Sequence, residues 1–405
     1  MSNLDYRTAG ESHGHSLITL VEGLPADLSI DPHAINEALR RRQGGYGRGG
    51  RMAIEQDRCD ILSGIRNGLT IGSPLAMQLA NKDHRIDQAP AVHRPRPGHA
   101  DFAGAMKWLT TDCRSTLERA SARETAARVM AGAVAAMLLR EFSIEVVGFV
   151  GRIGEATATV PEDMPAAQLR TARDANDVYC PDASVAGDMI AAIRKAKQAK
   201  DTVSGIVEIR ALGLPPGLGS CARWQDRLDG RLMAAVGSIQ AFKGVEIGLG
   251  FGCAERPGSQ VHDEIDYDPK QQQKPNLGYV RRSNNAGGIE GGMTNGMPIV
   301  LRAVMKPIST LMRGLDSINL KTRRPERSDY ERSDICAVPA ASVVAEYVVA
   351  FEIARVFLEK FGGDTMREVR AAYDYYLQSA RKLAEQAEPP NHITGDDINV
   401  HSQES

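Results

Sequence analysis

The amino-acid sequence predicts an α+β protein folded as one large domain. Long helical patterns and short strand-like stretches follow one another irregularly, without the repeated strand–helix–strand units of a parallel α/β sheet. There is no self-similarity with a period of about 20 to 50 residues, which excludes solenoids and propellers. No segment rich in glycine, serine and proline divides the chain. We therefore expect one domain over residues 1–387 and a loose polar tail over residues 388–405.

Helix-start signals locate the helices in chain order. Asp31 and Pro32 supply an N-cap and a first helical residue, which predicts a helix reaching Arg42. The string Ser121-Ala122-Arg123-Glu124 has the pattern of a capping box, and the alanine-rich stretch behind it predicts a deeply buried helix ending near Leu139. Further helices are predicted from residues 163–165 onward and over residues 184–200, 341–360 and 364–386, the last of them capped by Asp364.

Apolar stretches of strand length lie between these helices. They predict strands over residues 16–22, 144–150, 202–212, 245–251 and 297–305. Two glycine-rich segments, residues 44–51 and 287–292, stand apart from both kinds of element. Neither has the Gly-x-Gly-x-x-Gly pattern of a Rossmann site or the Gly-x₄-Gly-Lys pattern of a P-loop. Glycine still lets the backbone approach a ligand closely, so a phosphorylated cofactor bound by a less common route is expected.

Charge composition points to local anion sites. The chain has a net charge of −2, and its 49 basic residues divide into 37 Arg and 12 Lys. Arginine grips carboxylates and phosphates with two parallel hydrogen bonds, whereas lysine acts as a mobile point charge. A near-neutral protein does not attract nucleic acid or membranes through its overall field. Because a GC-rich genome also enriches arginine, composition alone does not assign a function.

Cysteine spacing and hydropathy exclude several classes of protein. The six cysteines are widely separated, so we expect reduced and mostly buried thiols, with no disulfide framework and no zinc site. The first residues contain no apolar segment resembling a signal peptide. The longest apolar run, residues 129–139, is too short for a membrane span, which needs about 20 residues. We expect a cytoplasmic protein with no metal and no membrane partner.

Four segments combine arginine, histidine, serine and glycine. His13 stands between small residues, where an imidazole on a turn can exchange protons near neutral pH, although such a histidine alone is more often a surface residue. Arg40 and Arg41 are predicted to lie on a solvated helix face. In the third segment, residues 94–101 with 119–124, prolines stiffen a loop that carries Arg96 and His99. Its second part, residues 119–124, is predicted to form an anion site at a helix start. The fourth consists of residues 306–310 with 332–336.

Taken together and in order, these segments resemble the chorismate synthase family. Its signatures occur here as residues 10–14 (Gly-Glu-Ser-His-Gly), 41–43 with 47–48, 96–101 (Arg-Pro-Gly-His-Ala-Asp), 119–125, 240–244, 285–289 with 291–292, 306–307 and 332–334. The resemblance spans about residues 5 to 375. Two departures are Ala120, where many members have serine, and Ser333, where many have histidine.

The resemblance implies a fold, a reaction and a cofactor. The family fold is a β-α-β sandwich, and the assembly is a homotetramer. The family eliminates phosphate from 5-enolpyruvylshikimate 3-phosphate in a 1,4-anti sense to form chorismate, the last step of the shikimate pathway. The reaction requires reduced FMN without net redox change. NADPH, used directly or through a separate flavin reductase, is the implied source of reducing equivalents.

The resemblance also assigns roles to individual residues. The implied catalytic residues are His13, which protonates the departing phosphate, His99, which stabilises the reduced flavin, and Asp334, which helps the flavin accept the substrate proton. The implied flavin contacts are Arg119, Ala120, Ser121, Gln240, Ala241, Gly291, Lys306, Pro307, Ile308, Ser309, Thr310 and Arg332. The implied substrate or NADP contacts are Ser12, Arg42, Arg48, Arg96 and Arg123; Arg42 and Arg48 suit either ligand.

Two other function classes compete with this reading. A single-stranded nucleic-acid binder would interleave its basic residues with stacking aromatics, but aromatics make up only 5% of the chain. A flavin reductase acting on nicotinamide would explain flavin contacts. It would not explain two histidines among so many anion-binding arginines.

Overall fold

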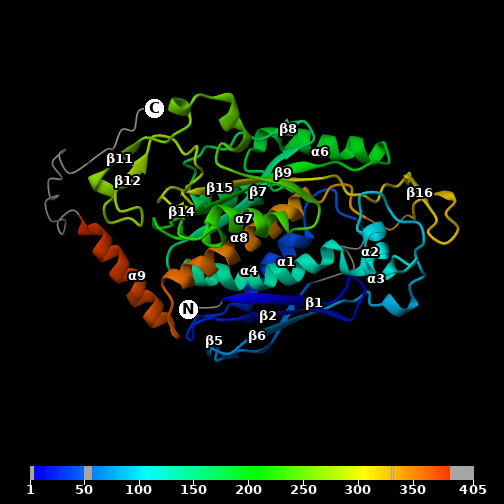
Figure 1. Ribbon diagram of the computed structural model, residues 1–405, viewed down its shortest axis with the longest axis horizontal. Helices are drawn as coiled ribbons and strands as arrows, with labels where there is room; N and C mark the ends of the chain where they lie inside the picture. The colour runs from blue at the N-terminus through cyan, green and yellow to red at the C-terminus, as the bar shows by residue number, and fades with distance from the viewer. Residues whose placement is uncertain (1–3, 50–56, 330, 332, 384–405) are drawn as a thin grey trace, which may run out of the picture.

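Two antiparallel sheets enclose a layer of helices in the computed structural model, which describes residues 4–49, 57–329, 331 and 333–383. Figure 1 shows the three layers edge-on, with one sheet below the helices and the other above them. The lower sheet has the strand order β1-β2-β6-β3, and the upper sheet has the order β10-β15-β9-β7-β8. The expected α+β class and the β-α-β sandwich are confirmed.

The strands of the two sheets are short to medium in length. The lower sheet contains β1 (Asp5–Ala9), β2 (Ser16–Glu22), β3 (Cys59–Ser63) and β6 (Leu75–Ala80), and the upper sheet contains β7 (Glu145–Ile153), β8 (Ala156–Thr157), β9 (Gly205–Leu212), β10 (Phe242–Ile247) and β15 (Ile299–Met305). Two-stranded ribbons are formed by β4 (Ile65–Arg66) with β5 (Leu69–Thr70), β11 (Ile265–Tyr267) with β12 (Tyr279–Arg281), β13 (Ile289–Glu290) with β14 (Met293–Thr294), and β16 (Asp316–Ile318) with β17 (Pro325–Arg327).

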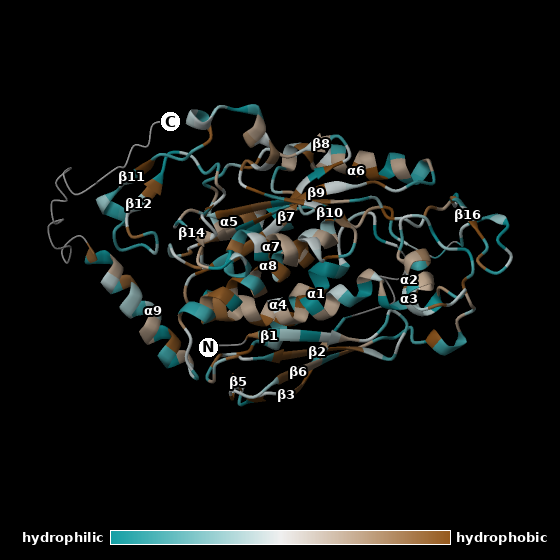
Figure 2. Cartoon of the chain, in the orientation of Figure 1, coloured by the Kyte–Doolittle hydropathy of each residue, from teal (hydrophilic) through white to brown (hydrophobic). Residues whose placement is uncertain are grey.

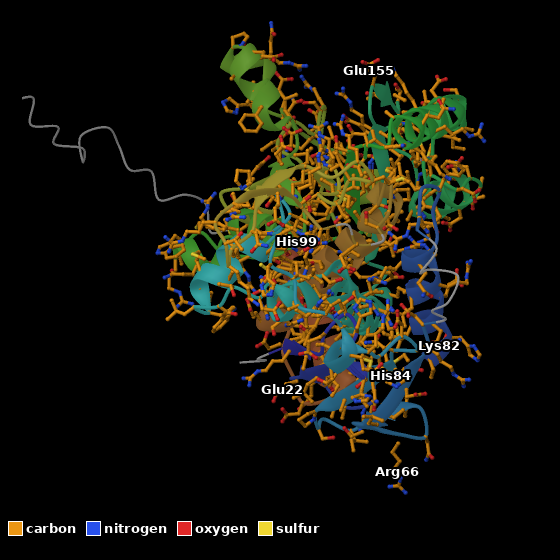
Figure 3. The ribbon with its side chains drawn as sticks, turned by 90° about the vertical axis from the view of Figure 1, so that its right-hand side faces the viewer. Glu22, Arg66, Lys82, His84, His99 and Glu155 are labelled. Atoms are coloured by element: carbon orange, nitrogen blue, oxygen red, sulfur yellow. The ribbon has the colours of Figure 1, made fainter. Side chains whose placement is uncertain are left out.

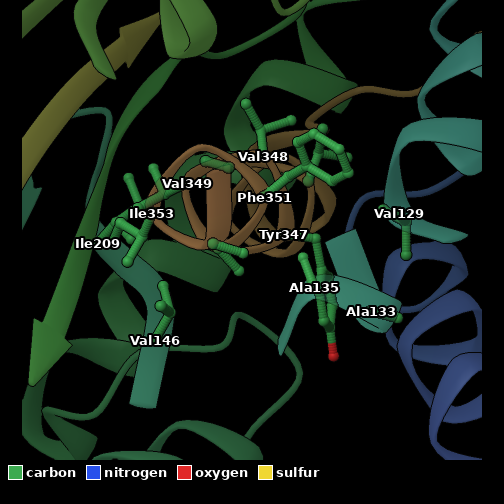
Figure 4. Close-up of a cluster of buried hydrophobic side chains, with 14 of the residues drawn as sticks. Val129, Ala133, Ala135, Val146, Ile209, Tyr347, Val348, Val349, Phe351 and Ile353 are labelled. Atoms are coloured by element: carbon green, nitrogen blue, oxygen red, sulfur yellow. The ribbon is translucent and has the colours of Figure 1, made fainter. Parts of the chain in front are cut away.

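Helices fill the space between the sheets and cover their ends. The described helices are α1 (Pro32–Gln43), α2 (Asp101–Lys107), α3 (Arg114–Arg119), α4 (Thr125–Arg140), α5 (Ala166–Asp174), α6 (Ala183–Gln198), α7 (Leu228–Gly237), α8 (Val338–Lys360) and α9 (Met366–Arg381). Helix α8 packs against α4 on one side and against β7 and β9 on the other. Figure 4 shows the apolar side chains of α4, β7 and β9 gathered around α8.

A glycine permits a close contact between two helices of this layer. A Cβ atom added at Gly132 of α4 would lie 2.2 Å from the carbonyl oxygen of Tyr347 in α8. Any side chain there would force the two helices apart. The predicted burial of the alanine-rich helix is therefore confirmed, and Figure 2 shows hydrophobic residues on these central elements.

Several predicted boundaries need correction. The strand at 16–22 and the Asp31 cap are confirmed, and the Asp31 side chain accepts from the backbone N–H of His33 at 2.8 Å. The strand predicted over 245–251 is wrong in its bounds, because β10 ends at Ile247 and residues 250–255 form a 3₁₀ turn. The last helix is capped by Thr365, which forms a capping box with Glu368, and not by Asp364. The predicted tail and the last residues of that helix lie outside the described residues.

The predicted capping box at Ser121 is also wrong. Ser121 caps a single 3₁₀ turn, η3 (Ala122–Glu124), and its hydroxyl accepts from the N–H of Arg123 at 3.3 Å. The Glu124 carboxylate does not return to the Ser121 backbone. It accepts instead from Thr8 at 2.7 Å and from Arg128 and Gln240.

Arg41 was predicted to be solvated but lies in the core. Its guanidinium group donates to both carboxylate oxygens of Glu346, at 3.1 and 3.0 Å, whereas Arg40 is exposed and pairs with Glu37. Four of the six cysteines are buried, Cys221 and Cys253 are exposed, and none forms a disulfide. Within the described ranges, no helix is long and apolar enough to cross a membrane, and no group of side chains could hold a metal ion.

Candidate functional site

The predicted site residues come from loops at one end of the sandwich. The turn between β1 and β2, the segment after β6 and the loops around α2 and α3 meet there, on the right of Figure 1. Figure 3 looks onto this end, with His99 near the centre and His84 and Lys82 below it. The loops following β15 and preceding α8 reach the same place through the contacts described below.

His13 is held by a buried carboxylate. Its ring Nδ1 lies 2.8 Å from Oε2 of Glu118, and its backbone N–H donates to the same oxygen at 3.0 Å. The side chain of Glu118 is fully buried. The neighbouring Ser12 is buried, and its hydroxyl accepts from that of Ser121 at 3.2 Å. The turn carrying His13 is thus anchored to α3 and to the start of η3.

His99 is held in the same manner. Its Nδ1 contacts Oδ1 of Asp101, a fully buried carboxylate at the start of α2. Arg96 binds both oxygens of Asp101, with Nε at 2.8 Å and Nη2 at 3.0 Å, and its Nη1 donates to the hydroxyl of Thr310 at 3.0 Å. Burial alone would raise the pKa of Asp101, but the hydrogen bonds from His99 and Arg96 outweigh it and hold that pKa well below its usual value.

Asp334 receives two donors from the first glycine-rich segment. Arg48 Nη1 donates to Oδ2 at 2.7 Å, and the backbone N–H of Gly49 donates to Oδ1 at 2.7 Å. The adjacent Ser333 donates its hydroxyl to the carbonyl of Thr310 at 3.0 Å. These bonds join the segment before α8 to the loop after β15.

Two buried arginines share one aspartate. Arg123 Nη1 donates to Asp57 at 2.6 and 2.8 Å, while Arg42 Nη1 lies 3.5 Å from the same carboxylate. Burial, together with the charges of Arg123 and Arg48, outweighs Asp57 and lowers the pKa of Arg42 to about 9. Among the described residues, Arg42 Nη1 has no hydrogen-bond partner. Because the positive charges are buried and the Nη1 donor of Arg42 has no hydrogen-bond partner among the described residues, this place favours binding of an anion.

Lys306 and Gln240 connect the loop after β15 to the His99 loop and to Glu124. The ammonium of Lys306 donates to the carbonyl of Gly98 at 2.6 Å, and its backbone N–H donates to the carbonyl of Ala241 at 2.9 Å. Burial lowers the pKa of Lys306. Gln240 donates to Glu124 at 3.1 Å, and its Oε1 is buried without a partner among the described residues. Ala241 has a φ of 71°, a strained conformation for a residue with a side chain.

Hydrogen bonds and ion pairs connect these residues, except that Arg42 and Arg48 are related only by the repulsion of their charges; we call the set the site ring. It is made up of Ser12, His13, Arg42, Arg48, Arg96, His99, Ser121, Arg123, Gln240, Ala241, Lys306, Thr310 and Asp334. The predicted residues Pro307, Ile308 and Ser309 lie between two ring members. Arg119 donates to the carbonyl of Gly10, next to the His13 turn, and Ala120 joins it to Ser121.

Gly291, a predicted flavin contact, is not brought into the ring. The carbonyl of Gly292 accepts from the N–H of Leu228, so Gly291 lies near the first residue of α7, whereas Gln240 follows the opposite end. A helix of this length spans about 15 Å. The assignment of Gly291 stays a prediction, and Arg332 lies outside the described residues.

Sequence patterns did not identify the side chains that orient the residues of the site ring. Glu118 and Asp57 belong to no recognisable motif, and only folding brings them to His13 and Arg123. Asn81 is another such residue. Its amide donates to the carbonyl of Gly14 at 2.8 Å and accepts from Arg123 at 2.9 Å, which ties the histidine turn to the arginine pair.

Comparisons with known proteins agree on one family. The model of the chorismate synthase family matches residues 4–358. The chorismate synthase of Geobacter sulfurreducens is 53% identical over 392 residues, covering 93% of this chain and 99% of the relative. That of Desulforudis audaxviator is 52% identical over 390 residues, covering 93% and 98%. A crystal structure of chorismate synthase superposes with a TM-score of 0.76 at 40% identity, covering 94% of this chain and 98% of that one. With its fold and nearly its whole length matched, this chain belongs to the chorismate synthase family, lyases of aromatic amino acid biosynthesis.

Proposed function

We propose that the site ring is where phosphate is eliminated from 5-enolpyruvylshikimate 3-phosphate to form chorismate. In this reaction a ring C–H bond and the C–O bond to phosphate break, a second ring double bond forms, and the proton and phosphate leave. The observation that carries the proposal is the pairing of two carboxylate-held histidines with buried arginines in one place. Proton exchange and anion binding are the two tasks that this chemistry sets.

The arginines of the site ring bind the substrate in this proposal. The substrate carries two carboxylates and one phosphate, and each is a bidentate partner for a guanidinium group. Arg42 supports this role because its Nη1 is buried without a hydrogen-bond partner in the described part of the chain. Binding an anion would also relieve the repulsion among Arg42, Arg48 and Arg123. Nicotinamide phosphate is the alternative ligand for Arg42 and Arg48, with NADPH as the reductant.

Reduced FMN would bind, in this proposal, along Gln240, Ala241 and Lys306 of the site ring. Gln240 presents a buried Oε1 with no partner among the described residues, and Lys306 offers a cation beside Gly98. An isoalloxazine ring and its phosphate provide matching donors and anionic oxygens. The residues that would hold the cofactor are Arg119, Ala120, Ser121, Gln240, Ala241 and Lys306 to Thr310, with Arg332 as a further contact. When bound, reduced flavin supplies electron density to the reacting ring and a nitrogen that accepts its proton.

The three catalytic assignments follow from where protons can be held. His13 Nε2 lies away from the carboxylate that holds Nδ1, so it can deliver a proton to the departing phosphate. His99 Nδ1 lies 3.0 Å from Arg96 Nη2, and Lys306 binds the adjacent Gly98, so His99 would face the cofactor in this proposal. Asp334, already paired with Arg48, is positioned to influence the proton on the cofactor.

The direct test is an anaerobic incubation with dithionite-reduced FMN and the enolpyruvyl substrate, followed by chorismate absorbance. We expect chorismate and phosphate in equal amounts and no net consumption of reduced flavin. A second reaction with oxidised FMN and NADPH, without added reductase, tests whether the chain reduces its own flavin. Absence of chorismate in the first reaction would contradict the proposal, while the second decides only the source of electrons.

The proposed setting is a cytoplasmic homotetramer acting on a small-molecule substrate, with a separate flavin reductase where the chain lacks that activity. The family resemblance supports this setting. Sedimentation of the purified chain with and without FMN tests the assembly.

Ser121 offers a test of the proposed cofactor contacts. Its hydroxyl caps η3 through Arg123 N–H and donates to Ser12, so Ser121→Ala should lose about 1 kcal/mol of stability and weaken FMN binding. Ser121→Asp keeps a capping oxygen but adds negative charge beside an anionic cofactor, so it should weaken FMN binding more than stability. Calorimetric melts and FMN titrations of both variants separate the two effects. FMN affinity equal to wild type in Ser121→Asp would show that Ser121 serves only as a cap.

A further inference from the structure

We propose that Glu118 is a positioning residue that sets the tautomer of His13, so that Nε2 is the atom exchanging protons with the leaving group. The inference rests on the proposed role of His13 as the acid. It adds a residue from α3 that no family signature quoted above contains.

Three contacts from one residue hold the histidine turn. The backbone carbonyl of Glu118 accepts from the N–H of Ser12 at 3.1 Å. Its Oε2 accepts from the backbone N–H of His13 at 3.0 Å and meets ring Nδ1 at 2.8 Å. Its Oε1 accepts from Arg114 Nη1 at 3.3 Å. The backbone position and the ring orientation of His13 are therefore determined by the same side chain.

The chemistry of the carboxylate determines the tautomer. Burial would raise the pKa of Glu118, but hydrogen bonds from His13 and Arg114 outweigh it and keep that pKa below its usual value. An ionised carboxylate can only accept hydrogen bonds, so Nδ1 must carry a proton. In neutral His13 the free lone pair is then on Nε2, and in protonated His13 the transferable proton is on Nε2.

The other charged groups around His13 do not replace this contact. Asp83, in the segment after β6, has Oδ2 3.8 Å from Nε2 and is paired with Arg85 at 3.1 Å. Arg114 reaches the histidine only through Glu118, and its other nitrogen binds Glu331 at 3.1 Å. The Glu118 carboxylate oxygen, 2.8 Å from Nδ1, therefore remains the group that orients the ring.

The test removes the charge of the Glu118 side chain while keeping its shape. In Glu118→Gln the amide oxygen can still accept from the backbone N–H and from Nδ1, but the negative charge is gone. We expect kcat to fall by about 10²-fold with KM nearly unchanged, because the loss concerns the proton and not substrate binding. Glu331→Gln is the matched control, since it removes a carboxylate from Arg114 without touching His13.

A second measurement does not depend on activity. Nitrogen-15 spectra of histidine-labelled protein, with His13→Asn to identify the resonance, report which ring nitrogen is protonated. We expect Nδ1–H in the wild-type protein and in Glu118→Gln. An Nε2–H tautomer in the wild type, an unchanged kcat in Glu118→Gln, or an equal fall of kcat in Glu331→Gln would overturn the inference. If His13→Ala keeps full turnover, the acid role fails instead, while the spectra still decide the tautomer.

Discussion

Replacing His13 by alanine is expected to lower turnover by about 10² to 10⁴-fold, which is the usual contribution of a positioned general acid. The side chain is held by Glu118 on its Nδ1 side, and no other histidine is bonded to that carboxylate in the described structure. Since the turn remains anchored through the backbone N–H groups of Ser12 and His13, the fold and FMN affinity should persist. Rapid chorismate assays with reduced FMN, together with flavin titrations, measure both quantities.

His99→Ala should show a similar fall in turnover for a different reason. Its ring lies against Asp101 and Arg96, so its loss should affect the cofactor side of the site. His33→Ala, an exposed histidine at the start of α1, provides the control and should behave as wild type. Turnover close to wild type in either site variant would refute the role given to that histidine.

Local sequence signals predicted the central elements well. The β2 strand, the Asp31 cap of α1 and the buried α4 helix depend on periodicity and capping within a few residues, which a single sequence contains. Errors arose where tertiary contacts decide. Glu124 has the spacing of a capping box with Ser121, but Thr8 and Gln240 take its carboxylate from other parts of the chain. The sequence of residues 121–124 contains no signal that predicts those partners.

Arg41 illustrates the same limit for charge patterns. Three consecutive arginines at the end of α1 suggest a solvent-exposed helix face. Their side chains nevertheless point in different directions, because successive residues of a helix lie about 100° apart around its axis. Arg40 faces water, Arg41 enters the core and Arg42 joins the site ring. The partners that make burial possible come from α8 and from residue 57, which are remote in sequence.

Most of the predicted site residues lie together in the structure, but the sequence did not predict which residues connect them. Motif strings identified His13, His99 and Asp334, because the family resemblance preserves residue types at fixed positions. The carboxylates that orient the histidines were not assigned roles. Asp101 stood inside a quoted motif without a function, and Glu118 stood outside every motif. Hydrogen-bond partners more than 100 residues apart are a property of the fold and not of local spacing.

Glu346→Gln should be the most destabilising substitution outside the site. The Glu346 carboxylate, in α8, accepts from Arg41 at 3.0 Å, from Arg173 at 2.8 Å and from the backbone N–H of Gly148 at 2.9 Å. Removing its charge leaves two buried guanidinium groups with only the half-exposed Asp174 as a counter-charge, 3.9 Å from Arg41 and 2.8 Å from Arg173. Loss of one partner of a buried ion pair typically costs about 3 to 5 kcal/mol. Denaturant unfolding near neutral pH measures this loss.

The pH dependence of that loss identifies its cause. Burial alone would raise the pKa of Glu346, but Arg41 and Arg173 outweigh it and lower the pKa to about 2, against 4.5 for a free glutamate. A depressed pKa in the folded state contributes stability that is complete above pH 4.5 and is lost as the pH falls toward 2. The stability gap between wild type and Glu346→Gln should therefore narrow over that interval. Glu37→Gln is the matched control, because it breaks an exposed pair with Arg40 on the same helix and should cost about 0.5 kcal/mol or less. A gap that stays constant down to pH 2, or a control that loses as much stability, would contradict a buried charge cluster as the source.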